Sequence, residues 1–138
     1  MRVLILSIIM FALSSFASPK IEVEHAWIRA VPPISKMTAG YMKIENKGTV
    51  DDELVGAETD ICKTVEIHTV YYEDDMMKMR KVDSIKVPAG GEVELKPSGY
   101  HLMLIGLKKH PKEGEKVKIK LLFKKSGTIE VEAEVRKR

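Results

Sequence analysis

Apolar and polar residues alternate in short segments along most of this chain of 138 residues, and turn-forming residues separate the segments. The alternating or β-rich segments are residues 21–29, 41–44, 65–67, 84–87, 92–95, 100–105, 116–121 and 128–135. Successive side chains of a strand point to opposite faces, so a period of two is typical of strands with one buried and one wet face. No segment beyond the N-terminus carries the apolar stripe of a helix. The sequence therefore predicts an all-β fold, an antiparallel sandwich or barrel.

The N-terminal segment, residues 1–17, has the features of a signal peptide. A positive charge at the start precedes an apolar run over residues 3–11, and Ser15 and Ala17 place small residues where a signal peptidase reads them. The apolar run is shorter than the ~20 residues that a membrane span needs. We therefore expect cleavage after Ala17, a single domain over residues 18–138, and a periplasmic protein with no membrane anchor after cleavage.

Charge and cysteine content exclude several classes of function. The formal net charge of +3 is too balanced for a nucleic-acid-binding protein, which usually shows a concentrated basic face. Cys62 is the only cysteine, so no disulfide can form within the chain and the fold must rely on packing. No serine–histidine–aspartate set, carboxylate pair or phosphate-binding loop stands out. We expect a protein that is not an enzyme.

Four potential metal ligands lie in the middle of the chain: His68, Met79, His101 and Met103. Ten residues separate the first from the second, twenty-one separate the second from the third, and one separates the last two. Two imidazoles and two thioethers form a neutral, soft donor set that suits Cu(I) and is poor for magnesium, calcium or manganese. If the four side chains converge, the sequence predicts one Cu(I) per chain.

The His101–Met103 pair is the firmest part of this prediction. Residues i and i+2 of a strand project to the same face, roughly 6.5–7 Å apart, so both side chains can reach one ion while Leu102 and Leu104 face the core. The same reasoning makes Met77 a candidate neighbour of Met79. The pattern alone does not bring His68 and Met79 to the pair.

Two other copper functions are compatible with a secreted domain that carries these ligands. An electron carrier of the blue-copper type needs a cysteine thiolate beside two histidines. Cys62 precedes both candidate histidines and no cysteine follows them, which makes electron transfer the weaker alternative and a small buried hydrophobe the better interpretation of Cys62. A copper buffer that confers metal tolerance would use the same ligands as a carrier, so it stays open.

Beyond the ligands, the chain resembles the periplasmic copper chaperones of the PCu(A)C, or PCuAC, family. The resemblance is carried by residues 65–68, 76–80, 87–91 and 99–104, and it extends to 26–30, 39–42, 52–55 and 106–107. It implies a cupredoxin-like Greek-key β-barrel that binds one Cu(I) through the four residues named above. It further implies delivery of copper to the CuA centre in subunit II of cytochrome c oxidase, often alongside a thioredoxin-fold Sco protein.

Two departures from the family pattern bear on the number of copper ions that the chain is expected to bind. Some members place a further methionine just after the first histidine, where this chain has Thr69 and Val70. Some also carry a tail rich in histidine and methionine for a second copper ion, whereas this sequence ends Val135-Arg-Lys-Arg138. We therefore expect one copper site and no relay through a second, in a protein that acts as a monomer.

Overall fold

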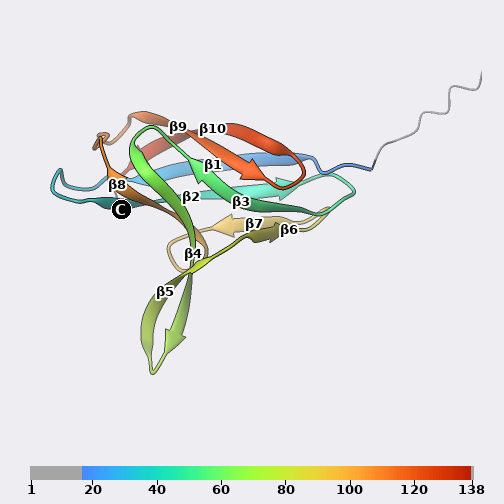
Figure 1. The fold of residues 1–138 in the computed structure, drawn as a ribbon, viewed down its shortest axis with the longest axis horizontal. Helices are drawn as coiled ribbons and strands as arrows, with labels where there is room; N and C mark the ends of the chain where they lie inside the picture. The colour runs from blue at the N-terminus through green and yellow to red at the C-terminus, as the bar shows by residue number, and fades with distance from the viewer. Residues whose placement is uncertain (1–16, 138) are drawn as a thin grey trace, which may run out of the picture.

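Ten β-strands and their connecting turns form the structure of residues 17–137, the part of the chain that the computed structural model describes (Figure 1). The strands are β1 (Ile21–Arg29), β2 (Met37–Asn46), β3 (Asp52–Glu58), β4 (Cys62–Glu73), β5 (Met76–Val82), β6 (Ile85–Val87), β7 (Glu92–Leu95), β8 (His101–Leu107), β9 (Lys116–Phe123) and β10 (Gly127–Arg136). The all-β prediction is confirmed. Within the described residues no helix is long and apolar enough to cross a membrane. The predicted signal peptide falls almost entirely outside these residues and stays a prediction.

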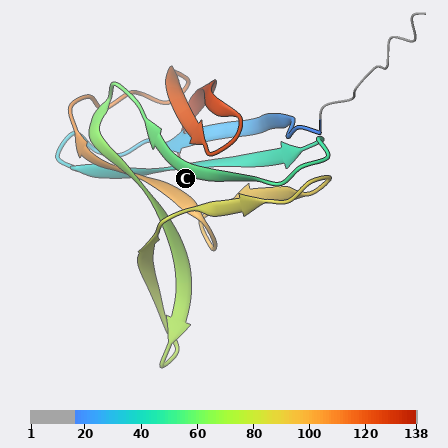
Figure 2. The same ribbon diagram turned by 45° about the vertical axis from the view of Figure 1, so that its right-hand side comes forward.

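The strands form one hydrogen-bonded sheet with the order β5-β4-β8-β2-β1-β10-β9-β3-β6, and β7 pairs with β2 beside this path. Every pairing is antiparallel except that of β1 with β10. Because β5 and β6 end the path, the sheet is curled and open rather than a closed ring. The β4–β5 hairpin projects away from the other strands in both views (Figures 1 and 2).

The core lies where the apolar faces of the curled sheet meet. In β9, Val117, Ile119 and Leu121 are buried while the intervening lysines are exposed, as the alternation predicts. Leu102 and Leu104 of β8 are fully buried at 0% exposure, which confirms that they face the core. Burial of these side chains is the main source of stability in a fold that has no disulfide, since the single cysteine is free.

Two buried polar side chains form hydrogen bonds with the loops and turns around this core. Asn46 accepts hydrogen bonds from the amides of Lys20 and Gly48 and donates to the carbonyls of Val50 and Val87. The carboxylate of Asp52 accepts bonds from residues 53, 125 and 126, so it ties the start of β3 to the β9–β10 turn. Burial alone would raise the pKa of Asp52, but these hydrogen bonds hold that pKa below its usual value.

Candidate metal centre

The β4–β8 pairing brings the two candidate histidines together. His68 and His101 are directly opposite each other in this antiparallel pair. Their ring centroids lie 5.8 Å apart with an angle of 49° between the rings. Directly opposite residues share one face of a sheet, so both rings project to the same side. The predicted β segment 65–67 stopped just before His68, whereas His68 lies in the middle of the twelve-residue strand β4.

Met103 joins the two histidines on this face. It lies two residues after His101 on β8 and directly opposite Glu66 on β4. Because Glu66 is itself two residues from His68, all four side chains belong to the same face of the sheet. Met103 is only partly buried. The expected same-face placement of His101 and Met103 is therefore confirmed by the register.

Met79 lies on the same face but one strand further out. It is directly opposite Val70 on β4, and Val70 is two residues beyond His68. Its side chain is 52% exposed, on the hairpin that projects from the sheet (Figure 2). Met77 is opposite Tyr72 and shares this face, whereas Met76 belongs to the other face. Three predicted ligands are thus adjacent, and the fourth stands at the outer edge of the same surface.

The ring nitrogens of His68 are buried without hydrogen-bond partners within residues 17–137, as expected of an imidazole that binds a metal. Both of its ring nitrogens are buried and neither has a hydrogen-bond partner among the described residues. The Oε1 atom of Glu66 lies 3.6 Å from Nε2, which is beyond normal hydrogen-bond length. An unpaired buried nitrogen lowers stability, and coordination of a metal ion would satisfy it. The donor set therefore fits copper, although the four-ligand assignment itself stays a prediction.

His101, the second candidate ligand, is buried and its ring is oriented by a backbone contact. It is 3% exposed, and its Nδ1 lies 3.1 Å from the carbonyl oxygen of Gly99. A neutral imidazole that donates from Nδ1 to this carbonyl keeps a lone pair on Nε2 for a metal. Burial lowers the pKa of His101, the Gly99 bond opposes this, and the charges of His68 and Arg29 add to the lowering. A lowered pKa favours the unprotonated ring, the form that copper binding requires.

An aromatic stack covers His101 on the side away from the hairpin. The Tyr41 ring lies 6.3 Å from the His101 ring and 4.5 Å from the Trp27 ring, measured between centroids. The Arg29 guanidinium carbon lies 5.5 Å from the Tyr41 centroid, within cation–π range. Tyr41 is almost fully buried. This stack packs against the inner side of the site, where His101 is buried.

Glu66 is the site residue that the sequence analysis missed. Its carboxylate lies 3.6 Å from His68 and 3.7 Å from the Nζ of Lys81. Lys81 is the residue opposite His68 on β5. The spacing of two between Glu66 and His68 was the available signal, because it places both on one strand face. Within the alternating pattern, however, a glutamate is most often an ordinary wet-face residue.

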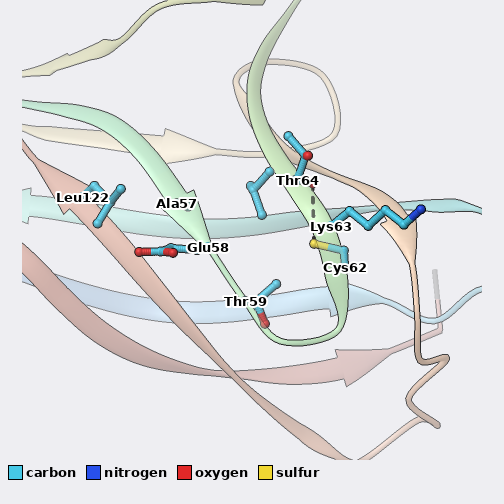
Figure 3. Close-up of a pocket in the computed structure, with 8 residues that line it drawn as sticks. Ala57, Glu58, Thr59, Cys62, Lys63, Thr64 and Leu122 are labelled. Atoms are coloured by element: carbon cyan, nitrogen blue, oxygen red, sulfur yellow. Dashed lines mark hydrogen bonds between the residues drawn. The ribbon is translucent and has the colours of Figure 1, made fainter.

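Cys62 is remote from the histidines. It begins β4, six residues before His68, which corresponds to roughly 20 Å along a strand. Its thiol is buried, donates to the Thr64 carbonyl at 3.5 Å, and lines a shallow pocket with Ala57 and Leu122 (Figure 3). Burial raises the pKa of the thiol, so it is not a ready thiolate ligand. The interpretation of Cys62 as a small buried hydrophobe is confirmed.

Replacement of His68 by leucine should separate stability from metal binding. We expect His68→Leu to raise the free energy of unfolding of the metal-free protein by about 1 kcal/mol, because it removes two unpaired buried nitrogens. Urea denaturation measures this change. His110→Leu is the matched control, since Nε2 of His110 bonds the Ser35 carbonyl at 2.6 Å and its loss should destabilise the protein. Destabilisation by His68→Leu would show that the imidazole has a structural partner.

The lowered pKa of His101 predicts a pH-dependent stability. The unfolded chain binds a proton at a histidine near its ordinary pKa of about 6.5, whereas folded His101 resists protonation. The free energy of unfolding of the metal-free protein should therefore fall as the pH drops below about 6.5, and stay level above it. Urea titrations between pH 7.5 and 5 test this. His101→Gln should reduce the slope, and an unchanged slope would assign it to another group.

Comparison with known proteins gives consistent matches. Residues 21–135 match the family model described as "Putative lipoprotein LpqE-like". The chain is 30% identical over 117 residues to "Putative lipoprotein Lxx21020" of Leifsonia xyli subsp. xyli, covering 84% of this chain and 69% of that protein.

Solved structures show the same fold. The copper-bound PCuAC domain from PmoF2 superposes with a TM-score of 0.74 at 25% identity, over 89% of this chain and 97% of that one. The solution structure of CuI-DR1885 from Deinococcus radiodurans gives a TM-score of 0.70 at 35% identity, over 91% and 84% of the two chains. These matches confirm the expected cupredoxin-like β-fold.

Proposed function

Because the chain belongs to the LpqE-like family, of the PCuAC class, we propose that it is a periplasmic carrier that binds one Cu(I) and delivers it to a partner. Its homologues of known structure are copper-binding PCuAC domains. The observation that supports the proposal best is the His68–His101 pair, with Met103 and Met79 on the same face. His68 in particular presents two ring nitrogens without a protein partner.

The chemistry of the donors favours carriage. Thioether sulfur is uncharged and soft, so it holds Cu(I) without the thiolate that an oxidising compartment would put at risk of disulfide formation. The imidazole of His101 adds a ligand that is already oriented by its contact with the Gly99 carbonyl. A set of four neutral ligands retains Cu(I) against water and still yields it to a protein that offers thiolates.

The arrangement of the site also suits transfer to a partner. His101 lies at the buried inner side, whereas Met79 is half exposed on the projecting hairpin. A partner's ligand would therefore replace Met79 first, while the inner histidine still holds the ion. Such stepwise exchange avoids release of free copper. The same exposed methionine would take part in loading.

The destination we propose is the CuA centre in subunit II of cytochrome c oxidase, with a thioredoxin-fold protein of the Sco type as a further partner. The family resemblance supports this choice. The chain would act as a monomer and not as an enzyme.

An electron-carrier function has less support, because Cys62 lies far from the histidines along β4. A copper buffer is the second candidate, and a deletion strain distinguishes the two. Failure of oxidase assembly at low copper favours delivery, and copper sensitivity with normal oxidase favours buffering.

Methionine variants on β5 test the ligand set. We expect Met79→Leu to weaken Cu(I) binding by at least about tenfold, because it removes a sulfur donor from the metal face. Met76→Leu is the matched control, since this methionine is also exposed and lies on the opposite face of the same strand. An anaerobic competition assay against a Cu(I) chelator measures both affinities. Equal affinities of the two variants for Cu(I) would show that Met79 is not a copper ligand. Failure of the unaltered protein to bind any Cu(I) would refute the proposed function.

Transfer of copper tests delivery directly. The Cu(I)-loaded protein is mixed under anaerobic conditions with a soluble CuA domain of oxidase subunit II, and the two proteins are separated and assayed for copper. We expect the ion to move to the thiolates of the CuA domain. A His101→Ala/Met103→Ala double variant, which should not load, is the control. Retention of copper by the loaded protein would favour the buffer function.

A further inference from the structure

The turn that joins β1 to β2 presents an apolar side chain to solvent. The Ser35 amide donates a hydrogen bond to the Pro32 carbonyl at 2.9 Å, which closes the turn. Ile34 occupies the third position of this turn and is 88% exposed, the highest value for a large apolar side chain among the described residues. Turns usually carry glycine or short polar residues, and a β-branched side chain at this exposure gains nothing from packing. Local structure therefore gives no reason for an isoleucine here.

This turn is held in place at one end of the molecule. Pro33 precedes Ile34 and fixes one backbone dihedral angle of the turn. The Ser35 carbonyl oxygen lies 2.6 Å from Nε2 of His110 in the β8–β9 loop. In both views the β1–β2 turn and the β8–β9 loop lie at the same end, and the β1–β2 turn is the outermost segment there (Figures 1 and 2). Ile34 thus stands on a projecting tip that proline stiffens.

Backbone hydrogen bonds bring three further segments to this end. The Lys36 carbonyl accepts from the amides of Gly106 and Leu107, at the end of β8. The carbonyl of residue 61, just before β4, accepts from the amides of residues 108 and 109. The carbonyl of residue 136, at the end of β10, accepts from the amide of residue 30. The β1–β2 turn, the start of β4, the β8–β9 loop and the C-terminal segment therefore share one end, which we call the basic end.

Exposed lysines gather at the basic end. None of them forms an ion pair within residues 17–137, whereas Lys116 and Lys118 of β9 do. The lysines outnumber the acidic residues of the same segments, which are Asp60, Glu113 and Glu115. The exposed lysines are Lys36, Lys63, Lys108, Lys109, Lys112 and Lys137.

The start of β1, at the other end of that strand, is acidic. Glu22, Glu24 and Glu45 bring their carboxylates within 4.8 Å of one another. Lys47 pairs with Glu22 and Glu45, and Lys43 pairs with Glu45, so the two lysines only partly offset this charge. Charge is thus distributed unevenly along β1. An anionic surface would attract the basic end and repel the acidic one, so it would hold the molecule in one orientation.

We propose that the basic end docks onto the surface of an anionic phospholipid bilayer, with Ile34 among the headgroups and the lysines beside the lipid phosphates. Peripheral segments bind membranes through this combination of an exposed apolar side chain and neighbouring lysines. A projecting tip can enter a headgroup layer, whereas a protein partner would have to offer a pocket for it. A second copy of the chain is a poor occupant, because the same lysines would then face one another.

Docking at the basic end keeps the candidate copper ligands out of the lipid. β8 begins at His101 and reaches the basic end after Leu107. Six residues of extended strand span roughly 20 Å, so His101 would stand well above the bilayer surface. None of the residues at the basic end is a candidate ligand, so the inference does not depend on the proposed function. One apolar side chain and a few lysines give reversible binding rather than a permanent anchor.

Cosedimentation with vesicles tests the inference. Residues 18–138 are used, because an uncleaved apolar segment at the N-terminus would itself bind lipid. Vesicles of phosphatidylglycerol and phosphatidylcholine in equal parts are compared with vesicles of phosphatidylcholine alone. We expect binding to the anionic vesicles only, and release as the salt concentration rises. Binding to neither vesicle, or equal binding to both, would overturn the inference.

Variants separate the two parts of the contact. We expect Ile34→Ser to weaken binding to the anionic vesicles about tenfold, through loss of apolar burial. The double variant Lys109→Gln/Lys112→Gln should weaken it by at least about tenfold, through loss of charge. Tyr72→Ser, which removes an exposed apolar side chain from the β4–β5 hairpin, is the control for the first. Exposed lysines outside the basic end provide the control for the second, as Lys86→Gln/Lys96→Gln. Equal losses in a variant and its control would overturn the inference.

A fluorescence measurement reports insertion of the tip. Ile34→Trp should bind the anionic vesicles as well as the unaltered protein does, and its emission should shift to shorter wavelength when they are added. The unaltered protein, whose only tryptophan is Trp27, is the reference. Absence of a shift specific to Ile34→Trp would show that the tip does not enter the lipid. Impaired copper transfer by Lys109→Gln/Lys112→Gln to the soluble CuA domain, with no vesicle binding by the unaltered protein, would assign the basic end to an acidic protein instead.

Discussion

The register of β4 against β8 is the constraint on which the metal face depends. It sets His68 opposite His101, and the adjacent pair, Ile67 opposite Leu102, is buried in the core on the other face. Because side chains alternate with a period of two, a slip of one residue would turn His68 into the core and Ile67 out to solvent. The free energy of burying the apolar pair therefore also fixes the position of the imidazoles. The same strand pairing therefore sets both the packing of the core and the position of the two imidazoles.

The site that results is asymmetric. The inner side is rigid, because His101 is buried, bonded to Gly99 and covered by the Tyr41 ring. The outer side belongs to the β4–β5 hairpin, where β5 pairs with β4 alone within residues 17–137 and Met79 is half exposed. Residues with few contacts beyond one hairpin open at low free-energy cost. A buried inner side with an exposed outer methionine is the arrangement that the proposed ligand exchange would use.

Several parts of this structure were predictable from residue patterns, and others were not. The alternation in residues 116–121 predicted the wet and dry faces of β9, and the spacing of His101 and Met103 predicted that they share a face. The extent of β4 was not predicted, because residues 68–73 do not alternate cleanly and the predicted segment therefore stopped at residue 67. The involvement of Glu66 was also missed, since a glutamate on an alternating strand resembles any solvated residue until its opposite partner is known.

The sequence by itself determined the all-β class, the donor types and, through their softness, the preference for copper, because these follow from side-chain periodicity and ligand chemistry. It also placed His101 beside Met103, since two residues on one strand need no tertiary information. Tertiary structure decided which strands pair. Sequence separation carries no information about register across strands, so only the fold set His68 against His101, put Met79 one strand further out and brought the Glu66 carboxylate to the same surface.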